Sequence, residues 1–193
     1  MRDLSTLVLG LVLLLAGCET TTVTSEPDRP EATDTDVDGD GQPDDTEPQG
    51  QQTAAVGDAI TLQGADDELQ VSVTVDEMID PATPGNDFDD PGEGRRYVAL
   101  RLTLANVGDV DYSDSPGNGA TLIDASNQQY DVAILGGDLA ECQSLGSSVT
   151  MPPGDTRTGC IGFALPADAA PDRFQFVLDS GFGPQTAVWR LAG

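Results

Sequence analysis

From about Val56 to the C-terminus, short stretches of alternating apolar and polar residues are separated by Gly, Pro and Asp. In the two clearest stretches, residues 69–75 and 98–104, every second residue is Leu or Val. Successive side chains of a β-strand point to opposite faces, so this period of two predicts strands with one buried face. The pattern is typical of an all-β domain, a single antiparallel β-sandwich over residues 56–193. Further strands are predicted at residues 60–62, 120–124, 129–134, 157–165, 173–178 and 187–191.

A different pattern lies at the N-terminus, where residues 7–16 are apolar except for Gly10. Ten residues in a helix cover roughly half of the ~30 Å hydrocarbon core of a membrane, which predicts a signal peptide and not a spanning helix. The run ends in Leu15-Ala16-Gly17-Cys18, which resembles the bacterial lipobox. This resemblance implies that residues 1–17 are removed and that Cys18 carries two or three acyl chains, palmitate among them. Such a lipid is a stable anchor at the extracytoplasmic face of the cell membrane. The alternative is an ordinary secretory signal in which Cys18 is incidental.

The segment after Cys18 has almost no large apolar side chains and is rich in Thr, Glu, Asp, Pro and Gln. Residues 18–56 contain eleven acids and one base, Arg29, and therefore carry a net charge of −10. A segment of this composition cannot bury enough apolar surface to offset the conformational entropy that it would lose on ordering. We expect residues 18–55, named here the acidic tether, to be a disordered linker.

Within the acidic tether, residues 36–47 match the calcium-loop pattern D-x-D-x-D-G-x5-E without a mismatch. The run resembles one thrombospondin type 3 calcium repeat more than an EF-hand, because prolines surround it and no amphipathic helices flank it. The alternative is a solvated acidic linker that meets the pattern because Asp is abundant. Ca²⁺ takes oxygen ligands, and the pattern assigns them to Asp36, Asp38, Asp40, Gln42, Asp44 and Glu47.

Two cysteines remain besides Cys18, namely Cys142 and Cys160. An exported protein with two remaining cysteines most simply joins them in a disulfide. Closing a loop of about 18 residues should stabilise the fold by ~3 kcal/mol. The competing interpretation is a pair of free buried thiols.

Composition excludes several classes of chemistry. The 193-residue chain has 34 acidic residues against 8 basic ones, all of them Arg, and a formal net charge of −26. Because His is absent, Ser-His-Asp or Cys-His catalysis and His-based zinc sites are excluded; without Lys there is no Schiff base or P-loop. The acidity also disfavours nucleic acid as a partner. Paired carboxylates could still hydrolyse glycosides, but most aromatic residues, Trp189 included, lie in predicted strands, where we expect them to form the core. We therefore predict no enzymatic activity.

The loops supply the candidate recognition residues. The acidic residues 86–94 predict a long solvated hairpin loop. Three further loops, at residues 113–118, 143–148 and 180–185, are rich in Ser, Gly and Asp and have ordinary turn composition. If they meet at one end of the sandwich, with Leu145 and Phe182 as apolar points, they form a recognition surface.

The motifs of the domain also resemble a known family. They are Val56-Gly57-Asp58, the strand start at residues 94–100, the turn at residues 106–109, and residues 152–156 leading into 159–163. In these motifs the chain is similar to a family of secreted domains called domain of unknown function 4352. The resemblance implies an immunoglobulin-like, telokin-like sandwich and an exported protein, and it implies no activity.

Together these observations predict a lipid-anchored, monomeric surface lipoprotein that presents an immunoglobulin-like module to an envelope or extracellular protein partner. The alternative is a calcium-responsive spacer of the cell envelope that uses loop 36–47. An enzyme that uses carboxylates is the third hypothesis.

Overall fold

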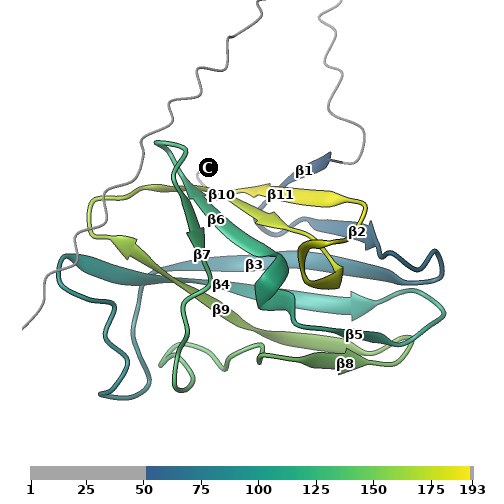
Figure 1. Cartoon of the computed structure of the whole chain (residues 1–193), viewed down its shortest axis with the longest axis horizontal. Helices are drawn as coiled ribbons and strands as arrows, with labels where there is room; N and C mark the ends of the chain where they lie inside the picture. Colours follow the sequence, from purple (N-terminus) through teal and green to yellow (C-terminus); the bar gives the residue numbers. More distant parts are fainter. Residues whose placement is uncertain (1–50, 192–193) are drawn as a thin grey trace, which may run out of the picture. The chain divides into compact units, whose positions relative to one another are not determined.

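Two β-sheets packed face to face form most of the part of the chain that the computed structural model describes, residues 51–191 (Figure 1). One sheet has the strand order β1-β11-β10-β6-β7, the other has the order β2-β3-β4-β9, and β5 and β8 form a separate pair. The prediction of an all-β sandwich is confirmed. The strands are β1 (Gln51–Ala55), β2 (Ala59–Gln63), β3 (Gln70–Ala82), β4 (Arg95–Asn106), β5 (Tyr112–Asp114), β6 (Ala120–Asp124), β7 (Gln129–Asp131), β8 (Val149–Met151), β9 (Thr156–Pro166), β10 (Pro171–Phe176) and β11 (Thr186–Arg190), with two short 3₁₀ helices, η1 (Pro116–Gly119) and η2 (Asp179–Gly181).

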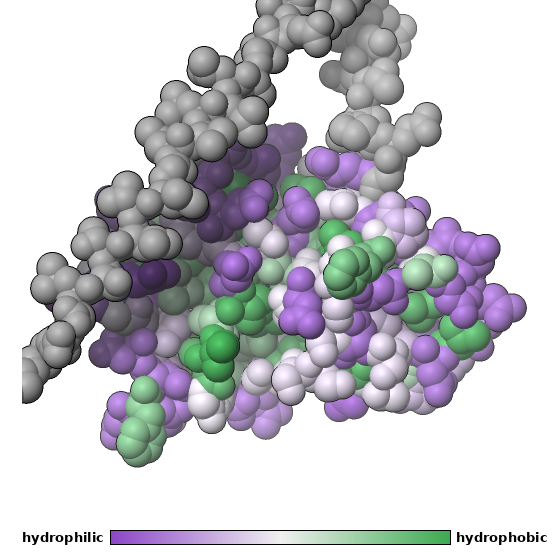
Figure 2. All heavy atoms as spheres, in the orientation of Figure 1, coloured by the Kyte–Doolittle hydropathy of each residue, from purple (hydrophilic) through white to green (hydrophobic). Residues whose placement is uncertain are grey.

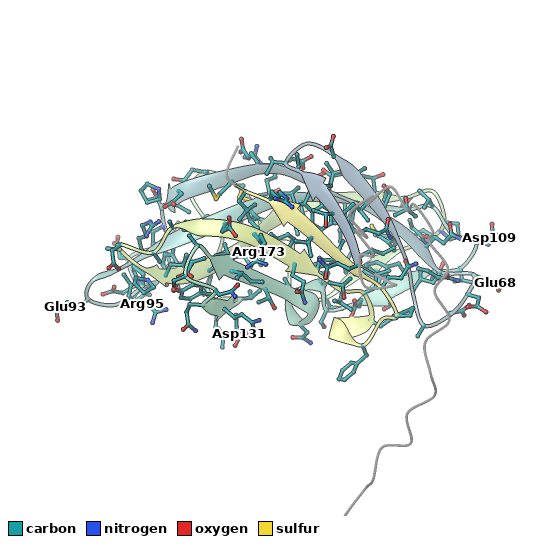
Figure 3. The ribbon with its side chains drawn as sticks, turned by 90° about the horizontal axis from the view of Figure 1, so that it is seen from above. Glu68, Glu93, Arg95, Asp109, Asp131 and Arg173 are labelled. Carbon is teal, nitrogen blue, oxygen red and sulfur yellow. A yellow bond between two sulfur atoms is a disulfide. The ribbon has the colours of Figure 1, made fainter. Side chains whose placement is uncertain are left out.

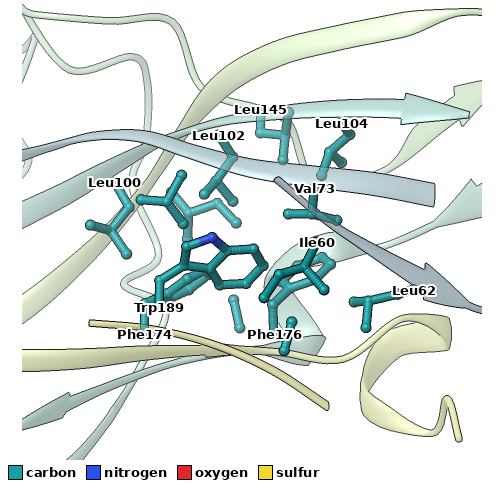
Figure 4. Close-up of a cluster of buried hydrophobic side chains, with 14 of the residues drawn as sticks. Ile60, Leu62, Val73, Leu100, Leu102, Leu104, Leu145, Phe174, Phe176 and Trp189 are labelled. Carbon is teal, nitrogen blue, oxygen red and sulfur yellow. The ribbon is translucent and has the colours of Figure 1, made fainter. Parts of the chain in front are cut away.

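The core lies between the two large sheets (Figure 4). The alternating Val and Leu residues of β3 and β4 are fully buried, as the period of two predicts. Opposite them lie Phe174 and Trp189, whose ring centroids are 5.8 Å apart. The indole Nε1 of Trp189 donates a hydrogen bond to the Asp58 carbonyl oxygen (2.9 Å), so this large side chain is buried with its polar atom satisfied. The predicted core role of Trp189 is confirmed.

The strands differ from the predictions most clearly in three places. Strand β1 lies in the segment assigned to the acidic tether, so residues 51–55, before the predicted start at residue 56, already belong to the sandwich. Its sequence has no large apolar residue, and it pairs in parallel with β11, which makes that sheet mixed. Strand β7 ends at Asp131 instead of continuing to Ile134. The short strands β5 and β8 were not predicted, because three residues are too few to show a period.

A second, smaller apolar cluster lies on the outer face of the β2-β3-β4-β9 sheet. There Tyr97 and Ala99 of β4 and Cys160 of β9 contact Leu139 and other residues from the connection between β7 and β8. Strand β4 is therefore buried on both faces from Tyr97 to Leu100. This covering connection, residues 132–148, positions the site described below.

Other segments pair with parts of the two edges of the β2-β3-β4-β9 sheet. Ala133 N donates to Gly162 O (2.8 Å) at the β9 edge. At the β2 edge, Gln63 N donates to the side chain of Gln185 (2.7 Å). Paired edges leave fewer free backbone groups to recruit another chain as an added strand.

Several predicted features lie outside the described residues: the signal peptide at 1–17, the lipidated Cys18, most of the acidic tether and the calcium-loop residues of 36–47. Among residues 51–191 there is no helix with the length and apolar character needed to cross a membrane.

Candidate functional site

A pocket of about 540 Å³ opens beside strand β9. Its floor consists of Cys160, Ile161 and Gly162, and its walls come from η1, from residues within 131–139 and from residues within 144–147. Figure 2, in the orientation of Figure 1, shows apolar side chains at the surface among polar ones near the end of β7. A second, shallower hollow shares Gly137 and Leu139 with this pocket. The two hollows and their rims are named here the pocket face.

Two glycines of β9 allow the covering connection to approach the strand closely. A Cβ atom at Gly159 would lie 2.6 Å from the Cα atom of Leu145, so the loop after the disulfide lies directly on β9. A Cβ atom at Gly162 would lie 3.0 Å from Cδ1 of Leu135 and 3.7 Å from Cδ1 of Leu139. The absence of side chains at these two positions therefore makes room for the walls of the pocket.

Covalent and hydrogen bonds fix the walls to the floor. Cys142 and Cys160 form the predicted disulfide, with their Cα atoms 6.1 Å apart. Beside it, Leu145 N donates to Cys160 O at 2.9 Å, while the other wall is held by the bond from Ala133 N to Gly162 O. The backbone of both walls is thus constrained, and we conclude that the pocket is preformed, as small-molecule sites usually are.

The hairpin loop between β3 and β4 also contacts the covering connection. The carboxylate of Asp89 accepts hydrogen bonds from Gly136 N (2.8 Å) and from the side chain of Asn86 (2.7 Å). Thr83 N donates to both carboxylate oxygens of Glu141 (3.0 and 3.2 Å), and the hydrogen bonds from Thr83 lower the pKa of Glu141. The predicted solvated loop is therefore partly held against the domain.

The acidic residues of this hairpin do not gather around a common point. No group of three or more Asp, Glu, His or Cys side chains in residues 51–191 is arranged to hold a metal ion. Asp131 is the one acidic residue that lines the pocket beside β9, so this pocket does not present the facing pair of carboxylates that glycoside hydrolysis needs.

A buried carboxylate fixes the wall that carries Asp131. Asp124 accepts hydrogen bonds from the hydroxyl of Ser126 (2.7 Å), from the backbone N of Gln128 (2.9 Å) and from the hydroxyl of Tyr130 (2.8 Å). These bonds, that of the Ser126 hydroxyl foremost, lower the pKa of Asp124 to about 2. Burial, together with the same hydrogen bond, raises the pKa of Tyr130. Strand β7 is thereby held against β6, and its last residue, Asp131, lies at the pocket.

The three predicted loops do converge on one side of the sandwich. Loops 113–118 and 143–148 both line the pocket. Loop 180–185 joins them because Ser180 Oγ donates to Asp114 Oδ1 at 2.6 Å. Phe182 is 88% exposed, as expected of an apolar residue on a recognition surface. The same expectation for Leu145 is wrong: it is buried and packs into the main core, since Gly159 lets its backbone come close to β9.

The turn that presents Phe182 has an uncommon backbone. Asp179, Ser180 and Gly181 all have positive φ angles (54°, 55° and 93°). The left-handed conformation costs roughly 1 kcal/mol or more at each non-glycine residue. Side-chain hydrogen bonds offset this cost, because Asp179 accepts from Ala65 N (2.6 Å) in addition to the bond that Ser180 donates.

Two exposed apolar residues of the pocket face were missed by sequence reasoning. Ile134 is 99% exposed and Phe88 is 95% exposed. Ile134 ends a stretch that alternates like a strand, so it was assigned to one. The signal that could have revealed Phe88 is its position among four acidic residues in residues 86–94, where burial is disfavoured.

The two packed sheets and the Cys142–Cys160 bond define a β-sandwich module that is braced by a disulfide. The chain belongs to the family described as domain of unknown function 4352 (DUF4352), whose profile matches residues 65–187. The resemblance predicted from the strand starts and turns is confirmed. No curated protein shows significant sequence similarity to the chain.

Solved structures support the fold. The chain is similar to MPT63, a secreted protein from Mycobacterium tuberculosis, with a TM-score of 0.51 and 16% identity over 74% of this chain and 99% of that one. It is also similar to ycdA from Bacillus subtilis, a candidate lipoprotein, with a TM-score of 0.53 and 12% identity over 72% of this chain and 39% of the other. At these identities the likeness concerns the fold alone.

Proposed function

We propose that the chain is a lipid-anchored extracytoplasmic protein whose sandwich domain binds a component of the cell envelope or its surroundings through the pocket face. The observation that carries the location is the disulfide between Cys142 and Cys160, because such bonds persist outside the cytosol and are rare within it. The lipobox-like tetrad ending in Cys18 supports the anchor. The secreted and candidate-lipoprotein proteins of the same fold agree with this location.

The binding role rests on the pocket face. The pocket face exposes Ile134 and Phe88 beside a constrained hollow, in a domain with a net charge of −16 from 22 acids and 6 Arg in residues 51–191. Exposed apolar side chains rimmed by polar ones mark interaction sites in soluble proteins. The acidic tether would hold this face away from anionic lipid head groups, which repel the domain.

The anchor is tested with the full precursor and a Cys18→Ser variant. Fatty-acid labelling and membrane fractionation should place label and protein in the membrane fraction for the natural sequence. Neither label nor membrane association should remain for C18S. Equal membrane association of both proteins would contradict the lipid anchor.

The binding role is tested by affinity capture from envelope extract with residues 19–193. Ile134→Asp and Phe88→Asp each add one charge to the pocket face. Val107→Asp is the matched control, because Val107 is also exposed (53%) and lies in the turn that includes Asp109, at the other end of the domain from Glu93 of the hairpin loop (Figure 3). The captured component should be lost with I134D and F88D and kept with V107D. Equal capture by all four proteins would refute the assignment of the face.

A second candidate function, a calcium-responsive spacer, rests on the match of residues 36–47 to a calcium loop. Ca²⁺ should then reduce the hydrodynamic radius of residues 19–193, and the change should vanish when Asp36 and Asp40 are replaced by Ala. Calorimetric traces that do not differ between the two proteins would end this proposal.

A further inference from the structure

The pocket beside β9 combines an apolar wall with a single charge. Among its lining residues the large apolar ones are Val132, Ile134, Leu135, Leu139 and Ile161. Neutral hydroxyl and amide groups come from the loops, as at Ser115, Asn118 and Ser144. The lining is therefore about half apolar and half polar, and its volume of about 540 Å³ lies in the range of small-molecule sites.

Asp131 is the charged residue of this lining. It is exposed, and no hydrogen bond or ion pair of its carboxylate is found among residues 51–191. Arg173, which Figure 3 labels together with Asp131, pairs with Asp172 (2.9 Å) and also donates to Asn127. This cation therefore has other partners, and the Asp131 carboxylate is available to a ligand.

The negative charge of the whole domain also favours a cationic ligand. None of the six Arg residues of the domain lines the pocket, while its net charge is −16. Anions are repelled by this field and find no donor cation in the pocket, whereas cations are attracted and concentrated.

We infer that the pocket binds a small organic cation with an apolar body: its ammonium or guanidinium group pairs with Asp131, and its hydrocarbon part contacts Leu135 and Leu139 of the wall and Ile161 of the floor. The inference rests on the proposed binding role of the pocket face and not on the lipid anchor. It names a ligand class that the fold and the family leave open.

Three six-carbon probes that differ only in charge test the inference: hexylammonium, hexanol and hexanoate. Each is titrated at low ionic strength into ¹⁵N-labelled residues 19–193, and the dissociation constant is read from the amide shifts of Gly137, Gly146 and Gly162 on the pocket lining. Hexylammonium should bind about two- to fivefold more tightly than hexanol, the range of an exposed ion pair, and hexanoate should bind most weakly. Added salt should reduce the advantage of the cation.

Asp131→Asn should remove the preference for hexylammonium over hexanol and leave hexanol binding unchanged. Asp109→Asn is the matched control: it makes the same change of charge at a distant end of the domain (Figure 3) and should keep the preference. Gly162→Ala adds a methyl group 3.0 Å from Leu135 Cδ1 and should weaken all three probes alike.

Equal effects of D131N and D109N, or hexanoate binding as tight as hexylammonium, would overturn the role of Asp131. The pocket would then still serve the proposed binding role if all three probes shift the same glycine amides. No shift with any probe at millimolar concentration would overturn the small-molecule site, while the capture experiment with I134D and V107D would continue to test the face independently.

Discussion

Removal of the disulfide should lower the stability of the domain by a calculable amount. The Cys142–Cys160 bond closes a loop with a sequence separation of 18. In the chain-entropy relation such a loop restricts the unfolded state by about 11 cal/mol/K, which is about 3 kcal/mol at room temperature. The 141 described residues (191 − 51 + 1) carry an unfolding entropy of about 0.3 kcal/mol/K. We therefore expect Cys142→Ala together with Cys160→Ala to lower Tm by about 10 °C.

Differential scanning calorimetry of residues 19–193 measures this shift. Reduced natural protein should match the double variant, and reductant should not change the double variant. Amide exchange adds a local measurement: Leu145 and Ala133 both donate to β9, but only Leu145 lies within the loop that the disulfide closes. Leu145 should therefore lose more protection than Ala133.

A Tm within about 2 °C of that of the natural protein would refute this reasoning, because it would mean that the unfolded chain is already restricted without the bond. Two thiols reactive in the native, unreduced protein would refute the premise itself.

Three further substitutions test the fold. Trp189→Ala should cost about 3–5 kcal/mol, measured by urea unfolding, because it leaves a cavity in the core and the Asp58 carbonyl without its donor. The folded-state pKa of Asp124, about 2, lies below its ordinary value of 3.8, so its stabilising effect is complete above about pH 4 and is lost as the pH falls through about 2. Asp124→Asn should thus lower Tm at pH 7. The difference in Tm between this variant and the natural protein should become smaller as the pH falls from 4 to 2, and a difference that does not change with pH would contradict this. Arg96→Lys should cost about 1 kcal/mol in the same urea assay, since Lys cannot form the paired bonds to Asp80 (2.6 and 2.7 Å), and an unchanged midpoint would show that the pair contributes nothing.

Local sequence patterns were sufficient to predict which side chains of the long strands face the core. The alternation of Val71, Val73 and Val75 depends only on strand geometry, and all three residues are fully buried. The disulfide was also predictable, because an exported chain with two available cysteines has one simple way to pair them. The family assignment followed from strand starts and turns, which are local as well.

The same local reasoning was insufficient where segments distant in sequence meet. Alternation predicts one buried face for residues 98–104, yet β4 is buried on both faces near Ala99, because the covering connection packs on its outer side. Strand β1 has no apolar pattern of its own and exists through its parallel pairing with β11, more than 130 positions later in the chain (Gln51 with Thr186). Pairing of this kind leaves no trace in the short sequence itself.

The sequence by itself therefore determined an all-β, disulfide-bonded domain that follows an acidic segment, because strand period, cysteine count and charge are properties of the chain. The tertiary structure alone decided where a ligand could bind. The pocket exists because Gly159 and Gly162 let residues 132–148 lie on the edge of β9, and because that packing buries Leu145 while it leaves Ile134 and Asp131 at the surface. Contacts between such distant segments depend on shape and volume in three dimensions, which no local pattern of residues records.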